Sequence, residues 1–221
     1  MSNTVASSEA TVRITEIFHS LQGEARTVGL PTVFVRLTGC PLRCVYCDTE
    51  YAFSGGELMS IGQICEQVAA YHPRYVTVTG GEPLAQKACI KLLQKLCDAD
   101  YRVSLETSGA MDISRVDPRV SRVVDMKTPA SAENDRNLLD NLEMLTRNDQ
   151  VKFVICDRDD YEWSKSMVAQ FGLLDRSDVL FSPAVPQLAP TELADWILAD
   201  QLNVRFQIQL HKILWGDARG K

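Results

Sequence analysis

Long apolar runs are missing from this 221-residue sequence, and so is any excess of positive charge. No stretch of about 18 consecutive apolar residues occurs, so we expect no membrane partner. Residues 1–10 lack the basic start and the apolar run of a secretory signal, and we expect them to be disordered in a cytoplasmic protein. The 23 lysine and arginine residues against 29 aspartate and glutamate residues give a net charge of −6, which argues against nucleic acid as a partner.

Compositional bias and internal repeats are also absent. Apolar residues make up 45% and charged residues 24% of the chain, which excludes a wholly disordered, collagen-like or coiled-coil protein. No linker-like break divides the sequence, so we expect residues 1–221 to form a single domain. We expect residues 213–221 to form a C-terminal tail.

Short β-branched runs alternate with helix-like patterns along most of the chain. Eight segments are predicted to be strands: 12–18, 32–38, 75–79, 102–106, 122–126, 151–155, 179–181 and 204–208. Five are predicted to be helices: about 60–71, which opens with Ser60 and Gln63 in capping-box spacing, 84–98, 136–146, 159–171 and 191–200. Strand then helix, repeated with short connections, is typical of βαβ units. Since a closed barrel of eight units takes about 250 residues, we predict an α/β fold, either an open sheet or a partial β/α barrel of about six parallel strands with flanking helices.

The loops after the predicted strands are the first candidates for a binding site, because ligands of such folds bind beyond the carboxyl ends of the strands. Three of the seven cysteines lie in the first of these loops, as Cys40-x3-Cys44-x2-Cys47. An odd number of cysteines in a reducing compartment does not indicate a disulfide framework. The spacing therefore points to a metal centre.

Zinc, a redox pair and an iron–sulfur cluster are the alternatives for this centre. A structural zinc site usually has four protein ligands in two pairs, and no second pair occurs in this sequence. A thioredoxin-type Cys-x2-Cys would leave Cys40 unexplained. A 4Fe–4S cluster held by three cysteines keeps one iron open for an outside ligand. The spacing favours that cluster, with Cys40, Cys44 and Cys47 as its ligands.

The motif Cys40-Pro-Leu-Arg-Cys44-Val-Tyr-Cys47 resembles the cluster motif of the radical S-adenosylmethionine (SAM) superfamily. Gly80-Gly81-Glu82-Pro83, at the end of the next predicted parallel strand, resembles the turn that binds the methionine part of SAM in that superfamily. The resemblance implies a partial barrel, with SAM on the open iron and electrons from a flavodoxin- or ferredoxin-type reductant.

The resemblance also assigns residues to SAM. Gly81 lets the backbone approach the methionine part, Lys127 is placed to meet the carboxylate, and 182–185 line the adenine end. A plain tight turn and a solvated lysine are the alternatives for the first two. The full set of expected SAM contacts is Tyr46, Gly81, Glu82, Ser108, Asp125, Met126, Lys127, Ser182, Pro183, Ala184 and Val185.

A second resemblance, over most of the chain, narrows the reaction. Ser20-Leu21-Gln22-Gly23-Glu24, Cys47-Asp48-Thr49, Glu106-Thr107-Ser108-Gly109 and Gln209-Leu210-His211-Lys212 are similar to the 7-carboxy-7-deazaguanine synthase family of queuosine biosynthesis. The resemblance implies a homodimeric lyase. It would convert 6-carboxy-5,6,7,8-tetrahydropterin to 7-carboxy-7-deazaguanine by magnesium-dependent ring contraction with loss of ammonia.

The substrate-binding residues implied are Leu21, Gln22, Gly23, Arg36 and Thr79. The Gln22 amide and its neighbouring backbone suit the polar edge of a pterin. Strand alternation turns Arg36 away from Val33, Val35 and Leu37, toward the site, where its planar fork suits a carboxylate.

Thr49 is the magnesium ligand that the resemblance implies, and we assign no acid or base residue. Two departures from the family pattern stand out. The chain continues past the His-Lys pair as 213–221, which puts closure of the pocket in doubt, and Asp125-Met126-Lys127 replaces a common Ser-Pro-Lys run. We expect the three histidines to be structural or exposed. A glycyl-radical-enzyme activating enzyme and a non-catalytic iron–sulfur or zinc protein remain as alternative functions.

Overall fold

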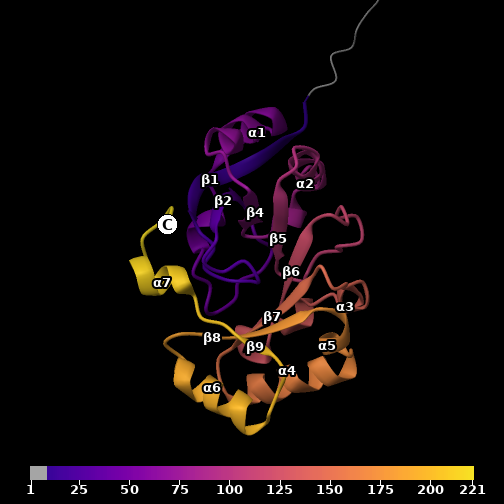
Figure 1. The fold of residues 1–221 in the computed structure, drawn as a ribbon, viewed down its shortest axis with the longest axis vertical. Coiled ribbons are helices and arrows are strands. Elements are labelled where there is room, and N and C mark those ends of the chain that lie inside the picture. Colours follow the sequence, from indigo (N-terminus) through magenta and orange to yellow (C-terminus); the bar gives the residue numbers. More distant parts are fainter. Residues whose placement is uncertain (1–8) are drawn as a thin grey trace, which may run out of the picture.

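The computed structural model describes residues 9–221, so most of the segment expected to be disordered, residues 1–8, lies outside the described residues (Figure 1). Nine strands form one sheet in the order β3-β1-β2-β4-β5-β6-β7-β8-β9. From β2 onward in this order all neighbouring strands are parallel, whereas β1 is antiparallel to both β2 and β3. The strands are β1 Thr11–Leu21, β2 Pro31–Leu37, β3 Glu57–Ser60, β4 Tyr75–Gly80, β5 Arg102–Thr107, β6 Ser121–Met126, β7 Gln150–Ile155, β8 Asp178–Pro183 and β9 Arg205–Phe206.

All eight predicted strands occur, and the incomplete, largely parallel sheet is confirmed. The first two strands, which have no predicted helix between them, pair antiparallel, because the connection 22–30 is shorter than the dozen or so residues that a parallel crossover needs. The prediction missed one strand. The edge strand β3 carries no alternating pattern that would have revealed it.

Helices cover the outer face of the sheet, with α1 and α2 at one end and α4, α5 and α6 at the other (Figure 1). The helices are α1 Ile61–Ala70, α2 Cys89–Asp98, α3 Asp140–Glu143, α4 Arg158–Gln170, α5 Leu173–Arg176, α6 Pro190–Ala199 and α7 Leu210–Trp215. The Ser60 and Gln63 capping box is present at the start of α1. Predicted helix 136–146 is reduced to α3 and a 3₁₀ turn, and α2 begins later than expected, at Cys89, behind a 3₁₀ turn. None of the helices in residues 9–221 is long and apolar enough to cross a membrane.

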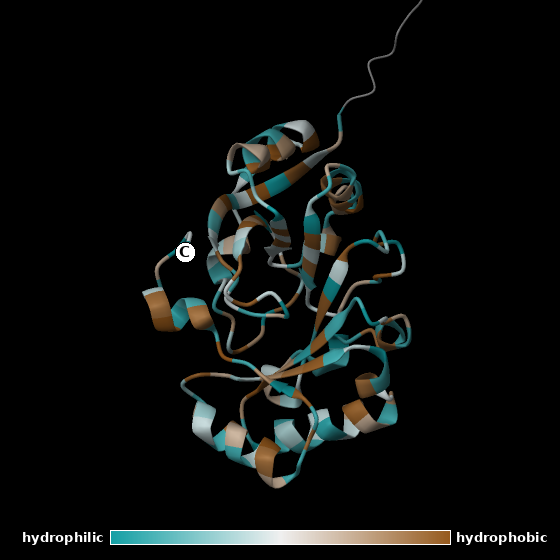
Figure 2. Cartoon of the chain, in the orientation of Figure 1, coloured by the Kyte–Doolittle hydropathy of each residue, from teal (hydrophilic) through white to brown (hydrophobic). Residues whose placement is uncertain are grey.

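The two faces of the sheet differ in polarity, as the alternating colours along the strands in Figure 2 show. Val33, Val35 and Leu37 are fully buried in the core beneath the helices. Phe34 and Arg36, on the other face of the same strand, line a cavity, as the alternation predicts. The inner face of the parallel sheet is therefore free to carry polar side chains.

Residues 22–30, between β1 and β2, tie the two ends of the sheet together. The Ala25 backbone exchanges two hydrogen bonds with the Gln207 side chain, at 2.8 and 2.9 Å. Arg26 pairs with Asp178 at 2.8 Å, and its backbone N–H donates to the Gln150 side chain. Three strands separate β2 from β7 in the sheet order, so these contacts require the sheet to curve strongly.

Candidate active site

The three motif cysteines lie in the loop that follows β2, and all three line one cavity, here called the cysteine cavity. The loop is held at its start because Gly39 N–H donates to Ala52 O at 2.7 Å and Glu82 N–H donates to Gly39 O at 2.8 Å. All three thiols are free, and burial raises the pKa of each one. The loop therefore presents three unbridged sulfurs to one space.

The donor set suits an iron–sulfur cluster better than a single metal ion. In the part of the chain that the structure describes, no three His, Cys, Asp or Glu side chains converge on one ion. Zinc requires such convergence, usually of four ligands. A 4Fe–4S cluster takes its thiolates at separate irons, so three spaced cysteines satisfy it.

The Gly80-Gly81 turn packs directly on the cysteine loop. A Cβ at Gly81 would lie 2.3 Å from Gly39 O and 2.7 Å from the Cys40 Cβ. Gly80 has φ +154°, and a Cβ there would lie 2.2 Å from Leu37 O. Only glycine permits this approach, which leaves a cradle beside the cysteines.

Glu82, a predicted SAM contact, holds this turn and is not among the residues that line the cavity. Its carboxylate is fully buried and accepts hydrogen bonds from Leu84 N–H, the Thr107 hydroxyl, and the backbone and hydroxyl of Ser108, at 2.5 to 3.0 Å. Met126 also does not line the cavity, because its side chain is buried in the core. The other expected SAM contacts all line it: Tyr46, Gly81, Ser108, Asp125, Lys127, Ser182, Pro183, Ala184 and Val185.

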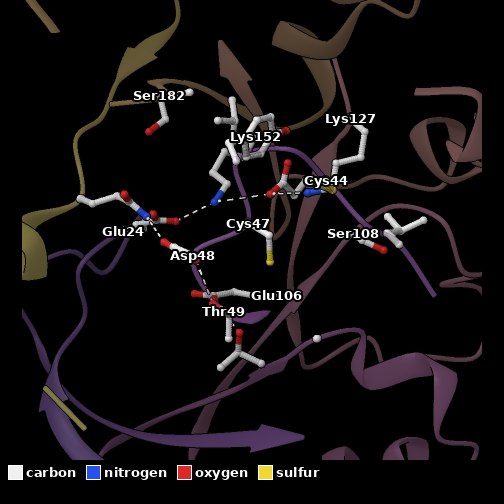
Figure 3. Close-up of a pocket in the computed structure, with 18 of the residues that line it drawn as sticks. Glu24, Cys44, Cys47, Asp48, Thr49, Glu106, Ser108, Lys127, Lys152 and Ser182 are labelled. Carbon is white, nitrogen blue, oxygen red and sulfur yellow. Dashed lines mark hydrogen bonds and ion pairs between the residues drawn. The ribbon is translucent and has the colours of Figure 1, made fainter. Parts of the chain in front are cut away.

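Alternating charges run along the inner face of the sheet beside the cysteines (Figure 3). Lys152 lies 2.6 Å from the Glu24 carboxylate and 3.6 Å from the Asp125 carboxylate, which in turn lies 3.1 Å from the Lys127 Nζ. Burial alone would lower the pKa of each lysine, but these carboxylates raise it above its ordinary value, so both lysines are charged at neutral pH.

Two buried polar atoms in or beside this row of charged side chains have no hydrogen-bond partner within residues 9–221. They are the Asp125 Oδ1 and the Tyr46 hydroxyl, both on residues of the cysteine cavity. Buried polar atoms are nearly always paired. These two unpaired atoms, together with the glycine cradle and the three thiols, fit a polar cofactor bound beside a cluster.

A second cavity, here called the C-terminal cavity, adjoins the first and includes all the predicted substrate residues, Leu21, Gln22, Gly23, Arg36 and Thr79. The two cavities share Glu24, Asp48, Thr49, Thr79, Gly80, Glu106, Lys152, Gln209 and Lys212. A ligand in one would therefore lie next to a ligand in the other.

Glu106, which no prediction assigned to the substrate, organises the boundary between the cavities. Its carboxylate accepts hydrogen bonds from the Gln22 amide at 3.2 Å and the Thr79 hydroxyl at 2.8 Å. Burial, reinforced by the charge of Glu24, raises the pKa of Glu106. The signal for this role was its position at the end of a parallel strand.

Arg36 faces the C-terminal cavity as predicted, but its charge is already paired. Its Nε lies 2.7 Å from Glu16 Oε1, which also accepts a 2.8 Å hydrogen bond from the Tyr51 hydroxyl. The guanidinium lies 5.9 Å from the centre of the Phe18 ring and 5.8 Å from that of Tyr51. Arg36 is therefore a fixed part of the wall, with part of its charge neutralised.

The cysteine loop is joined to the C-terminal segment through Asp48. The carboxylate accepts from the Thr49 hydroxyl at 2.8 Å and the Gln209 amide at 3.0 Å, and lies 3.2 Å from the Lys212 Nζ. Burial would raise the pKa of Asp48, but the charge of Lys212 and these hydrogen bonds hold it well below its usual range. Thr49 thus lies where both cavities meet.

His211 and the tail after it also line the C-terminal cavity. The prediction that His211 is structural or exposed did not include a position in the cavity wall. Burial lowers the pKa of its imidazole. Residues 216–221 line the same cavity, so the tail forms part of its wall. The Gln209-Leu210-His211-Lys212 motif was the signal available in the sequence.

Comparisons with known proteins agree with this site. The model of the Radical SAM superfamily matches residues 34–125, which include the three cysteines and the glycine turn. A 7-carboxy-7-deazaguanine synthase from Chlorobaculum tepidum is 44% identical over 97% of this chain and 99% of its own length, and one from Koribacter versatilis is 43% identical over 92% and 97%. The crystal structure of QueE from Escherichia coli has a similar fold, with a TM-score of 0.70 at 22% identity, over 90% of this chain and 94% of that one.

Proposed function

The chain belongs to the 7-carboxy-7-deazaguanine synthase family of radical SAM enzymes, and from this membership we propose that it converts 6-carboxy-5,6,7,8-tetrahydropterin to 7-carboxy-7-deazaguanine in queuosine biosynthesis. One observation carries the proposal for this chain. The cavity lined by Cys40, Cys44 and Cys47 shares nine lining residues with a second cavity, which is lined by amide, carboxylate and guanidinium groups. That arrangement lets a polar heterocycle lie beside SAM.

The cysteine cavity binds the cofactors in this proposal. Cys40, Cys44 and Cys47 hold a 4Fe–4S cluster, and SAM bound at that cluster supplies the radical that removes a hydrogen atom from the substrate. Gly81 leaves room for the methionine part, and the unpaired Asp125 oxygen accepts a hydrogen bond from the cofactor. The charges of Lys152 and Lys127 are balanced by those of Asp125 and Glu24, so this wall is neutral overall.

The polar edge of the pterin pairs with the boundary between the cavities. The Glu106 carboxylate has lone pairs beyond those used by Gln22 and Thr79, so it accepts from the ring N–H and amino groups. The backbone of 21–23 supplies further donors and acceptors beside it. Burial of these groups makes the recognition selective, because an unmatched polar edge would leave them unpaired.

Magnesium binds at Thr49 in this proposal. The Thr49 hydroxyl lies where both cavities meet, and magnesium accepts one or two protein oxygens beside water and substrate oxygens. Removing that hydroxyl in Thr49→Ala should raise the magnesium concentration needed for half-maximal turnover by about tenfold, the scale of losing one metal contact. An unchanged magnesium response would remove Thr49 from the role.

We further propose a single radical SAM domain in a cytoplasmic homodimer that binds no nucleic acid. The continuous core beneath one sheet supports the single domain. Seven free cysteines support a reducing compartment.

Val45, which is 61% exposed between Cys44 and Tyr46, supports access for a flavodoxin- or ferredoxin-type reductant. Apolar Ile213 and Leu214, exposed on α7, support self-association.

A turnover assay tests the function. Anaerobically reconstituted enzyme is incubated with carboxytetrahydropterin, SAM, magnesium and a reductant, and the ultraviolet absorbance of the deazaguanine product is followed. Product formation is expected only when all components are present, and no product would overturn the assignment. A glycyl radical on a partner protein would support an activating enzyme instead. Zinc in place of about four irons per chain would support a non-catalytic metal protein.

A further inference from the structure

The C-terminal tail forms one wall of the substrate cavity and is anchored at both of its ends. At its start, Leu210 N–H donates to Gly23 O at 3.0 Å, and Lys212 pairs with Asp48 at 3.2 Å. At its far end, the Arg219 guanidinium lies 4.3 Å from the centre of the Tyr51 ring. The residues between these contacts, from Gly216 onward, line the C-terminal cavity. The tail thus lies over the place where the pterin is proposed to bind.

Arg219 is one of two cations of this cavity, with Lys221, that make no ion pair within residues 9–221. Lys152 is paired with Glu24, Lys212 with Asp48, and Arg36 with Glu16, which lies behind the cavity wall. The Arg219 guanidinium lies over the face of the Tyr51 ring. A guanidinium stacked on a ring keeps its N–H fork free for a planar anion.

Tyr51 links this free cation to the paired one. The guanidinium groups of Arg36 and Arg219 lie 5.8 and 4.3 Å from the centre of its ring, and its hydroxyl donates to Glu16. The carboxylate of Glu16 balances one of the two positive charges. No carboxylate within residues 9–221 pairs with Arg219, so its charge remains available on the tail beside Tyr51.

We propose that Arg219 binds the carboxylate of the substrate and so selects carboxylated pterins over pterins without that group. This inference rests on the proposed function. Arg36 keeps its place in the wall and shapes the same subsite, while the tail residue supplies the unneutralised charge.

The test compares two ligands in matched variants. Dissociation constants for 6-carboxytetrahydropterin and for tetrahydropterin, which lacks the carboxylate, are measured with Arg219→Gln, Arg219→Lys and the wild type, all reconstituted with cluster and SAM. Arg115→Gln is the control, because Arg115 is exposed and lines neither cavity. Arg219→Gln should weaken the carboxylated ligand by about 10- to 100-fold, the value of one charge-assisted hydrogen-bonded pair. The ligand without a carboxylate should change by less than about twofold, within the scatter of neutral substitutions.

Arg219→Lys should recover part of the affinity, because it keeps the charge and loses the fork. The proposal is overturned if Arg219→Gln weakens both ligands equally, if it weakens neither, or if Arg219→Lys is no better than Arg219→Gln. Reductive cleavage of SAM without substrate reports the cysteine cavity separately and should be unchanged. A wild type that cleaves SAM but neither binds nor turns over the carboxylated pterin would overturn the proposed function along with this inference. Normal wild-type turnover with an unaffected Arg219→Gln would overturn this inference alone.

Discussion

Replacing Lys152 by methionine tests the alternating charges of the inner sheet face. The methionine keeps the length and apolar stem of the side chain but leaves the carboxylates of Glu24 and Asp125 without the ammonium that lies 2.6 and 3.6 Å from them. Breaking a buried ion pair from one side costs about 3–5 kcal/mol, because an uncompensated charge stays in a medium of low dielectric constant. The loss is a sizeable part of the roughly 5–15 kcal/mol by which a domain is stable.

The same carboxylates predict a recovery in the double variant. Glu24→Gln with Lys152→Met removes both charges of the closer pair, while Asp125 keeps Lys127 at 3.1 Å. We expect the double variant to regain at least half of the lost stability, since pairs in direct contact are strongly non-additive. In the native protein the Lys152 ammonium lowers the pKa of Glu106. In the single variant Lys152→Met the Glu106 carboxyl should therefore titrate at a higher pH.

Urea unfolding under anaerobic conditions, followed by circular dichroism, measures the effect. With an m-value of about 2–3 kcal/mol/M, the single variant should lower the midpoint by about 1–2 M. Lys165→Met is the control, because Lys165 also has two carboxylate partners, Glu162 at 3.0 Å and Asp200 at 2.5 Å, but lies at the surface. Such a pair is worth about 0–1 kcal/mol. Equal midpoint shifts in the two lysine variants would refute the reasoning, since burial is the difference between them.

Two other substitutions test the architecture around the site. Gly81→Ala places a Cβ 2.3 Å from Gly39 O and 2.7 Å from the Cys40 Cβ. We therefore expect the reconstituted variant to bind SAM more than about tenfold more weakly than the wild type in an equilibrium binding measurement. Wild-type affinity would mean that the turn has room to move. Asp149→Asn removes a buried carboxylate. Burial alone would raise the pKa of Asp149, but hydrogen bonds from Arg122 and Thr146 hold it below its usual value. The charged form stabilises the fold above about pH 4 and that contribution is lost as the pH falls through the lowered pKa, so the variant should be about 3 kcal/mol less stable at pH 7 and should lose less stability than the wild type on acidification. Parallel pH dependence of the two urea midpoints would contradict this.

The strands and the cysteine loop were predictable because their signals are local. Alternation in β2 placed Arg36 on the inner face, and the spacing of Cys40, Cys44 and Cys47 matched one loop of one cavity. Each of these depends on residues within a few positions of one another, where strand geometry and loop length decide the outcome.

The remaining features depend on contacts between distant segments. The hydrogen bonds from the hydroxyls of Thr107 and Ser108 to the Glu82 carboxylate join the ends of two neighbouring strands, and no local pattern predicted them. His211 has no metal-ligand spacing, and tertiary packing brings it against Gly23, where a Cβ would lie 2.2 Å from its Nδ1. Such pairings are set by tertiary packing, which overrides local patterns.

The connection 22–30 acts as a chord across an arc. One end of it carries Gln22 and Gly23, which line the substrate cavity, and its middle is bonded to Gln207, Gln150 and Asp178 on the opposite flank. Adding or removing a strand would change the width of the curved sheet by a whole strand, whereas the connection 22–30 can change by single residues. A longer or shorter connection would therefore widen or narrow the substrate cavity for larger or smaller ring systems, without a change in the cysteine loop.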